Sequence, residues 1–597
     1  MTDDRVSRLV EEARRLRWSR RKVLKRAAAL GLSAPAISMV LAACGGDDPA
    51  ATTAPAPAPA TTPTAGAATT PAPAETPDVE EPTATTAAPV GGGGIINIPT
   101  TLGDSGIGNP ILTSNIQMIE YYVFNRLMIY NDEGTLVPEL AADWTFSDDN
   151  LTLTITLNEA TWHDGEAFTA DDVIFTFDTI AAETTETGKR SNLRVAGEFV
   201  TWAKVDDYTI TITSPEAFAP LLFQLNQIPI IPEHLLSGSA DINTDEFNRS
   251  PIGTGSYMLE EWASDQFMRF VPYENHFRGR ARNDGLTVFF YADTEVSSAA
   301  LDAGTIDMMF TPPELQPRYE GNPNFKLYNY VYFTPITLSF NHKHPILQDI
   351  TVRRAIGMAI DKVALTESVT RGRGTIANNQ FANSGPLDRY NDYDNVEPIP
   401  FDVAGANAML DEAGYAAGSD GIRVAPDGTR FEFDVITYSG FEEYQNGQVI
   451  IQEMLREIGM EVTPQVVEYT TLEGMWADPN DPPENRALEL EEWPHPFEFD
   501  PDLFNELHSD SLPPGLNYMW FEDDEVDRLI EVGRTTTDPD ERVAVYKELD
   551  VRRSETLPTL PLYNAVDGWV ASTALQGVAD TPYYRRYVLT SAQDWSK

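Results

Sequence analysis

Three groups that could serve as acid, base or metal ligand stand close together in the sequence: His163, Asp164 and Glu166. A hydrolase could use such groups for proton transfer. The pair Asp164-Gly165, however, is typical of a tight turn whose glycine is left-handed. The sequence contains no zinc-protease H-E-x-x-H, no P-loop, no G-x-S-x-G elbow and no paired cysteines. We interpret the segment as a turn, and we predict no enzyme activity, no cofactor and no metal ion.

Other candidate groups are less informative. His342 and His344 form the one close pair among seven histidines, and two imidazoles at this spacing could bind a metal. We expect a solvated turn there instead. Glycoside hydrolysis needs two carboxylates at a defined separation, and a chain with 92 acidic residues offers many such pairs by abundance alone.

The only cysteine, Cys44, follows a short apolar stretch that ends in small residues, and basic residues including Arg20 and Arg21 precede that stretch. This order resembles a bacterial lipoprotein export signal with a twin-arginine pair. We expect residues 1–43 to be removed and Cys44 to carry the lipid. The chain would then be extracytoplasmic and anchored to the outer face of the cell membrane, at the cell surface or in the periplasm. The alternative is an alanine-rich start with a buried free thiol.

Residues 44–94 consist largely of Pro, Ala and Thr and end in four glycines. A segment with so little apolar side-chain mass does not fold on its own and favours polyproline II. The sequence therefore predicts a tether between the anchor and the folded part.

The formal net charge is −50. Residues 1–43 hold ten Arg and Lys against four Asp and Glu, so the chain without them would carry −56. This charge opposes binding to nucleic acid, and we predict no nucleic-acid partner. Two causes remain open: a field that attracts the ligand, and adaptation of the whole surface to high salt.

Residues 95–597 are too many for one ordinary core and predict at least two lobes. Alternating apolar residues predict strands, helical spacing predicts helices, and Thr169 with Asp172 forms a capping box. The fold class is mixed α/β (α+β). The expected elements are strands over 151–157, 208–212, 431–435 and 462–467, and helices from 169, over 349–369, over 402–413 and through 449–455. The last two strands and the helix between them predict a parallel βαβ unit.

Five motifs, in order along the chain, resemble those of one family. That family is the extracellular solute-binding proteins, family 5, of peptide and nickel ABC importers. The motifs are Pro138-Glu139-Leu140-Ala141-Ala142-Asp143-Trp144, Trp162 to Val173, Pro251-Ile252-Gly253-Thr254-Gly255-Ser256-Tyr257, Val352 to Asp361 and Pro561-Leu562-Tyr563.

The resemblance implies a two-lobe periplasmic-binding-protein-like clamp with an extra N-terminal subdomain. By analogy, lobe I comprises 95–137, 249–335 and 556–597, the extra subdomain 138–248 and lobe II 336–555. The strands that cross between the lobes serve as hinges, and a membrane ABC permease recognises the closed form. We expect a monomer that captures a peptide or a peptide-sized solute. Two alternatives stay open, a surface sensor or adhesin of the same fold and a secreted hydrolase.

The resemblance also suggests where the solute binds. Trp493 and Asp500 match the family's Trp and Asp-Pro, but Pro496 stands where peptide-binding members carry the Asp that receives the α-ammonium. Glutamates nearby could replace it. The predicted ligand-binding residues are Trp493, Tyr469, Tyr563, Glu491, Glu492, Glu498, Asp500, Asp104, Gly253 and Thr254.

Overall fold

The computed structural model describes residues 93–597 except 102, 113–116, 132–133, 333, 477, 479, 481–485, 493–498, 514 and 581–584. The predicted signal peptide, Cys44 and nearly all of the predicted tether lie outside the described residues. No helix in the described part is long and apolar enough to cross a bilayer.

Two large hydrophobic cores divide the described chain. The first contains buried residues between Ile96 and Tyr330 and again from Trp569 to Trp595. The second contains buried residues from Ile336 to Ala565. The chain therefore leaves the first core, builds the second and returns, which is the organisation of a two-lobe clamp and confirms the predicted fold class. The lobe boundaries in residue numbers stay a prediction.

The first core is built on two sheets. One has the strand order β1-β14-β13-β12, with β1 parallel to β14, and the other has the order β15-β25-β16. The elements are β1 (Ile95–Thr100), α4 (Gln117–Tyr122), β12 (Tyr257–Ala263), β13 (Phe267–Pro272), β14 (Gly285–Phe290), α8 (Thr294–Asp302), β15 (Met308–Thr311), β16 (Phe325–Val331), β25 (Val566–Ser572) and α17 (Arg585–Thr590).

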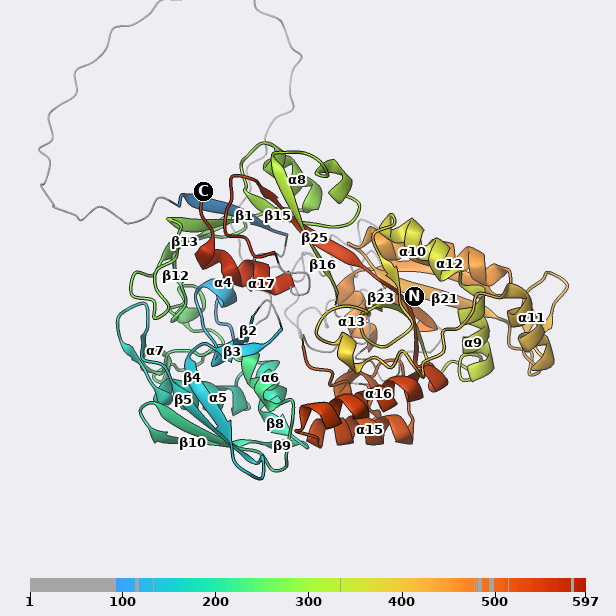
Figure 1. Cartoon of the computed structure of the whole chain (residues 1–597), viewed down its shortest axis with the longest axis horizontal. Helices are drawn as coiled ribbons and strands as arrows, with labels where there is room; N and C mark the ends of the chain where they lie inside the picture. The colour runs from blue at the N-terminus through green and yellow to red at the C-terminus, as the bar shows by residue number, and fades with distance from the viewer. Residues whose placement is uncertain are drawn as a thin grey trace, which may run out of the picture. The chain divides into compact units, whose positions relative to one another are not determined.

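Part of this core belongs to a separate four-stranded sheet of order β10-β11-β5-β4. Helix α5 packs against it (Figure 1). In β5 the apolar side chains alternate inward, as predicted, and the predicted capping box opens α5: the Thr169 amide donates to Asp172 Oδ2 at 2.9 Å. The elements are β2 (Met128–Tyr130), β3 (Leu136–Pro138), β4 (Ala141–Phe146), β5 (Thr152–Leu157), α5 (Ala170–Ala181), β10 (Thr201–Asp206), β11 (Thr209–Thr213), α6 (Leu221–Asn226) and α7 (Glu233–Leu236).

The second core surrounds a six-stranded sheet of order β18-β24-β17-β23-β21-β22. Strands β21 and β22 are parallel and joined by α12, so the predicted βαβ unit is confirmed. The elements are β17 (Ile336–Phe340), α9 (Ile350–Ala359), α10 (Lys362–Thr370), β18 (Thr375–Ile376), α11 (Val403–Glu412), β21 (Glu432–Tyr438), α12 (Glu442–Arg456), β22 (Glu461–Val467), α13 (Tyr469–Trp476), β23 (Leu488–Glu492), α14 (Phe504–Leu507), α15 (Asp524–Thr535), α16 (Pro539–Thr556) and β24 (Thr559–Asn564).

One predicted helix was wrong. The helix expected over 349–369 is two helices, α9 and α10. Asp361 separates them because its side chain accepts hydrogen bonds from the amides of Val363 and Ala364, both at 3.0 Å. A carboxylate in this position caps a new helix and competes with continuation of the old one.

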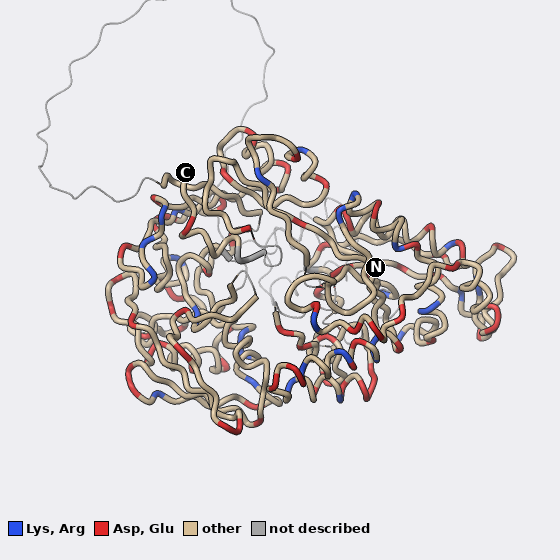
Figure 2. Tube along the Cα trace, viewed as in Figure 1, with Lys and Arg blue, Asp and Glu red and all other residues tan. Residues whose placement is uncertain are grey.

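Acidic residues are spread over the whole described chain (Figure 2). Both cores and the helices between them carry many Asp and Glu positions, with fewer Lys and Arg among them. The Asp and Glu residues are not concentrated in one region of the described chain. The cause of the charge excess stays open between the two explanations given above.

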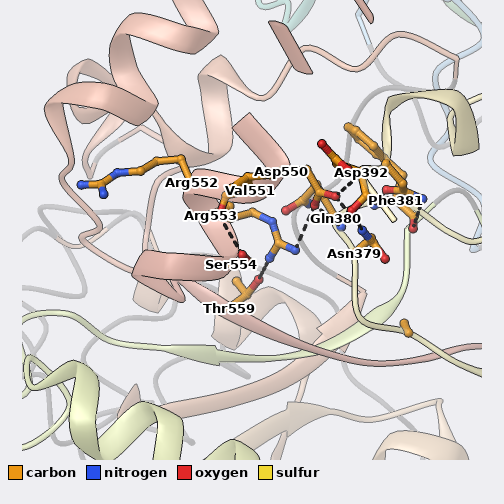
Figure 3. Close-up of polar contacts among 12 residues, drawn as sticks. Asn379, Gln380, Phe381, Asp392, Asp550, Val551, Arg552, Arg553, Ser554 and Thr559 are labelled. Atoms are coloured by element: carbon orange, nitrogen blue, oxygen red, sulfur yellow. Dashed lines mark hydrogen bonds and ion pairs between the residues drawn. The ribbon is translucent and has the colours of Figure 1, made fainter. Parts of the chain in front are cut away.

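A buried carboxylate on α16 ties three segments of the second core together (Figure 3). Asp550 Oδ2 accepts from the Asn379 side-chain amide at 2.7 Å, and Asp550 Oδ1 accepts from the backbone amide of Gln380 at 2.9 Å. Arg553 lies 3.6 Å from Asp550 and donates to Thr559 Oγ1 at 3.2 Å. These contacts fix α16 to the segment after β18 and to the start of β24.

Replacing Asp550 by Ala should lower the free energy of unfolding by about 3–5 kcal/mol, because the buried Arg553 guanidinium loses its carboxylate and several buried amides lose their hydrogen-bond acceptor. Chemical denaturation of the purified chain measures this change. Glu548→Ala, an exposed position on the same helix, is the matched control and should change stability by less than about 0.5 kcal/mol. Equal stabilities of the two variants would show that the network contributes nothing.

Candidate functional site

The carboxyl ends of three strands meet at one edge of the six-stranded sheet. Strands β21 and β23 are parallel, and β24 runs the same way because β23 and β24 are both antiparallel to β17. These strands end at Tyr438, Glu492 and Asn564. In open α/β sheets ligands bind outside the carboxyl ends of the strands. We call this region the carboxyl edge and define it by Tyr438, Glu443, Tyr469, Glu491, Glu492 and Tyr563.

The carboxyl edge is also where the chain passes between the two cores. Strand β16 leads into β17, and β24 leads into β25 (Figure 1). The pairs β16–β25 and β17–β24 are each antiparallel, so two neighbouring connections join the sheets. Side chains at this edge therefore stand at the junction of the two cores.

Glu491 and its neighbour Glu489 are buried on one face of β23. Trp476 Nε1 donates to Glu489 Oε1 at 3.0 Å, and the Tyr518 hydroxyl donates to Glu491. Burial, followed by the charge of Glu489, raises the pKa of Glu491 well above its usual range. Burial also raises the pKa of Glu489, against the opposing effect of Arg486, whose guanidinium lies 3.7 Å away. The alternative that the β23 glutamates form a solvated strand edge is wrong, because β23 lies between β17 and β21.

Aromatic rings line this face. Trp476 stacks on Tyr518 with ring centres 4.5 Å apart, and Tyr469 meets Trp476 edge-on at 5.8 Å. Tyr469 also contacts Tyr438 at 5.2 Å. Tyr469 is 46% exposed, whereas Trp476 and Tyr518 are more deeply placed. The rings offer a surface on which a planar or cationic group could stack.

Glu492 projects to the opposite face of β23, since side chains alternate along a strand. Its Oε1 accepts from Thr334 Oγ1 at 3.0 Å. Glu443, in the first turn of α12, and Tyr563, on β24, are both buried, and their side chains lie within hydrogen-bonding reach of each other. Burial, followed by the Asp567 carboxylate, raises the pKa of Glu443 to about 8. The structure thus brings four predicted residues together at the carboxyl edge: Tyr469, Glu491, Glu492 and Tyr563.

Asp500 forms a structural ion pair. Both of its oxygens accept hydrogen bonds from Arg542, each at 2.8 Å, and the pair is nearly buried. This ion pair holds the segment that precedes α14 against helix α16. Trp493 and Glu498 lie outside the described residues. The binding roles assigned to all three stay predictions.

Asp104, Gly253 and Thr254 are held by contacts within the first core. Asp104 accepts from Trp262 Nε1 at 3.1 Å. A side-chain carbon on Gly253 would lie 1.7 Å from the Val123 carbonyl oxygen, so the close approach requires glycine there. Thr254 is fully buried. Binding roles for these three residues also stay predictions. Each residue makes contacts that stabilise the first core.

The predicted turn at Asp164-Gly165 is confirmed, with Gly165 at φ 96°. The His163 ring contacts the Gly255 carbonyl oxygen at 2.9 Å, and burial lowers the pKa of His163 to about 4. Its neighbourhood is a packed corner of the first core.

The predicted turn at His342 and His344 is present, with the His344 amide donating to the Asn341 carbonyl oxygen at 3.0 Å, but the prediction that it is solvated was wrong. Both are largely buried and pack edge-on against phenylalanines, at 5.1 Å from Phe521 and from Phe433. Within the described ranges no group of three or more His, Cys, Asp or Glu is placed to hold a metal ion.

The sequence reasoning missed Glu443 of the carboxyl edge, and it missed Glu489 and Asp567, which act on the pKa of Glu491 and of Glu443. Glu443 could have been found, because it follows a strand of the predicted βαβ unit, where the ligand-binding edge lies. Glu489 alternates with leucines in Leu488-Glu489-Leu490-Glu491, a pattern that normally indicates one wet face. No sequence feature showed that this face is covered.

Two cores joined by neighbouring strand connections, with a polar and aromatic edge at the junction, define a two-lobe solute-binding protein. The family model of bacterial extracellular solute-binding proteins, family 5 (Middle), matches residues 135–520. The chain belongs to this family, and the predicted resemblance is confirmed.

Individual relatives agree with this assignment. The chain is 26% identical over 509 residues to the oligopeptide-binding protein AppA of Bacillus subtilis, covering 79% of this chain and 89% of AppA. The solved structure of that AppA with a nonapeptide gives a TM-score of 0.71 at 25% identity, covering 84% of this chain and 99% of AppA. NikZ of Campylobacter jejuni, solved with Ni(L-His), gives a TM-score of 0.72 at 24% identity over 84% of this chain and 99% of NikZ.

The raised pKa of Glu443 predicts a stability that falls as pH rises. The folded state holds this proton up to about pH 8, whereas an unfolded glutamate releases it near its ordinary pKa of 4.5. The contribution is therefore fully present below about pH 4.5 and is lost between that value and about pH 8. Glu443→Gln removes this pH dependence. The free energy of unfolding of the variant minus that of the unsubstituted chain should therefore increase by about 1.4 kcal/mol per pH unit between pH 5 and 7.

Urea denaturation at pH 5, 6 and 7 measures this difference, in which the other carboxyl groups cancel. Glu442→Gln, the exposed neighbour in the same helical turn, serves as the control and should follow the unsubstituted chain. Parallel pH profiles for Glu443→Gln and the unsubstituted chain would contradict the buried, protonated Glu443.

Proposed function

We propose that this chain is the solute-binding lipoprotein of an ABC importer, and that it captures a peptide or a peptide-sized solute between its lobes and delivers it to a membrane permease. Membership of family 5 supports the transport role. The observation that carries the proposal is the carboxyl edge, where buried carboxyl groups and aromatic rings stand at the junction of the two cores.

The relatives support a peptide-sized solute. One is named an oligopeptide-binding protein and was solved with a nonapeptide, and a structural neighbour was solved with Ni(L-His). A clamp closes when the solute binds the closed arrangement better than the open one, and contacts to both lobes supply that difference. The two connections β16–β17 and β24–β25 are the proposed hinges.

Anchoring is the second part of the proposal. Cys44 stands after an apolar stretch and before a tether of about fifty residues, which at roughly 3 Å per residue could reach about 150 Å from the membrane. One diacylglycerol group on Cys44 provides two acyl chains, enough for stable attachment.

Solute capture is tested by incubating the purified full-length chain with a peptic digest of casein. After desalting, peptides that stay bound are released by denaturation and identified by mass spectrometry, and tryptophan fluorescence follows a titration with the same digest. We expect a selected set of intact peptides and a saturable fluorescence change. Shortened peptides would indicate a hydrolase, and the absence of any retained peptide would refute peptide capture.

Anchoring is tested in the bacterial cell with Cys44→Ala. We expect the unsubstituted chain in the membrane fraction with a diacylglycerol-modified N-terminal peptide, and the variant free of the membrane and unmodified. Ser38→Ala, within the same apolar stretch, is the control and should behave like the unsubstituted chain. Membrane retention of Cys44→Ala would rule out the lipid anchor.

A further inference from the structure

The two cores also touch at a place where no strand passes between them. The amide of Ala219, just before α6, donates a hydrogen bond to the carbonyl oxygen of Arg534 at 2.7 Å. Arg534 lies in the last turn of α15, where a helix leaves its carbonyl oxygens without donors of its own. A segment of the first core therefore supplies the donor that the end of a second-core helix needs.

The Arg534 side chain crosses the same contact. Its guanidinium carbon lies 4.9 Å from the ring centre of Phe218 and 4.1 Å from that of Phe504. Its Nε lies 3.3 Å from an oxygen of Asp502. Phe218 belongs to the first core, whereas Phe504 begins α14 on the second-core side. Arginine is attracted to the faces of aromatic rings, so this cation is fully surrounded only while the two cores are in contact.

A small apolar cluster also joins the two cores. It consists of the buried side chains of Tyr130 on β2, Phe223 on α6 and Phe499, with Leu136 packed against them. Phe499 is the member from the second-core side, and its ring centre lies 4.6 Å from that of Tyr130. Phe499 is 6% exposed, so residues of the first core withdraw this ring from water.

The tip of the β2–β3 hairpin fits closely against the second core. Gly134 has φ 72°, and a side-chain carbon there would lie 2.5 Å from Pro386 Cγ and 2.9 Å from the Phe499 ring. Pro386 precedes Leu387, which packs with residues of α15 and α16. The hairpin tip therefore leaves no room for a side chain at Gly134.

We propose that these contacts form a latch that stabilises the closed clamp and thereby sets the affinity for the solute. The latch comprises Gly134, Phe218 and Ala219 on the first-core side and Phe499 and Arg534 on the second-core side. The proposal deepens the proposed function and rests on it. None of the five belongs to β16, β17, β24 or β25, so opening about the proposed hinges separates one side of the latch from the other.

The latch acts through the balance between the open and the closed arrangement. Opening withdraws Arg534 from the Phe218 ring, exposes the Phe499 ring and leaves the Ala219 amide to water. The apparent dissociation constant equals the intrinsic one divided by the fraction of the binding-competent state, so a weaker latch lowers affinity. Because release of an enclosed solute requires opening, the loss of affinity falls on the dissociation rate.

The latch is tested with a wedge, Gly134→Asn. Asparagine tolerates the left-handed backbone at this position, but its side-chain carbon collides with Pro386 and Phe499. Gly304→Asn is the matched control, because Gly304 has φ 70° and an added carbon there meets no atom within 4 Å.

The full-length chains are loaded with the peptic digest of casein, and tryptophan fluorescence after dilution follows release. We expect Gly134→Asn to release bound peptides at least fivefold faster than Gly304→Asn, which should match the unsubstituted chain. Equal release rates in the two variants would overturn the latch and leave solute capture intact.

A second readout needs no solute. The Ala219 amide is hydrogen-bonded across the contact, so its hydrogen–deuterium exchange reports whether the latch is formed. We expect faster exchange at Ala219 in Gly134→Asn than in Gly304→Asn, with unchanged exchange in β5. If no chain retains the digest, the proposed function fails and this comparison alone decides on the latch. Equal exchange at Ala219 in the two variants would overturn it.

The role of the guanidinium is tested with Arg534→Ala. Arg528→Ala is the control, since Arg528 lies on the same helix and pairs with Glu525 within α15. Arg534→Ala should release bound peptides severalfold faster than the unsubstituted chain, and Arg528→Ala should not differ from it. Unchanged release from Arg534→Ala, with its circular dichroism spectrum intact, would remove Arg534 from the latch.

Discussion

The chain returns from the second core to the first, and this return fixes how the two cores are joined and where the carboxyl edge lies. Because β17 and β24 are neighbours in one sheet and continue as β16 and β25 in another, the two cores are joined through adjacent strands. The same geometry places the carboxyl ends of β21, β23 and β24 at the junction. A solute bound at this edge lies where both cores can contact it, and it can therefore shift their relative arrangement.

Desolvation gives the carboxyl edge its chemical character. Glu489 and Glu491 on one face of β23 and Glu443 on α12 are withdrawn from water, and burial is the largest cause of each raised pKa. On one face Arg486, Trp476 and Tyr518 satisfy the carboxyl groups. On the other side Glu443 and Tyr563 lie beside each other, and burial raises the pKa of both groups. The overall charge of −50 explains neither arrangement, because surface carboxylates stay in water and these do not.

Local patterns in the sequence were sufficient for much of the fold. The capping box at Thr169 and the parallel βαβ unit around α12 were predictable because helix caps and strand alternation depend on neighbouring residues. The break at Asp361 was missed although the cap that causes it is local, whereas the burial of His342 was not predictable because it depends on what packs against that residue. The site was predictable in part: Tyr469, Glu491, Glu492 and Tyr563 meet at the carboxyl edge. Glu443 was missed although it follows a strand of the predicted βαβ unit, and Asp567 comes near it only because β25 continues from β24. Family motifs indicated the two-lobe fold, but motif matching could not reveal which carboxyl groups are buried.

The protonation state of Glu443 tests the account most directly. Infrared difference spectroscopy of the unsubstituted chain against Glu443→Gln, at pH 6 and free of solute, should show the carbonyl band of one protonated carboxyl group. A carboxylate band of Glu443 in place of the carbonyl band at this pH would contradict the account.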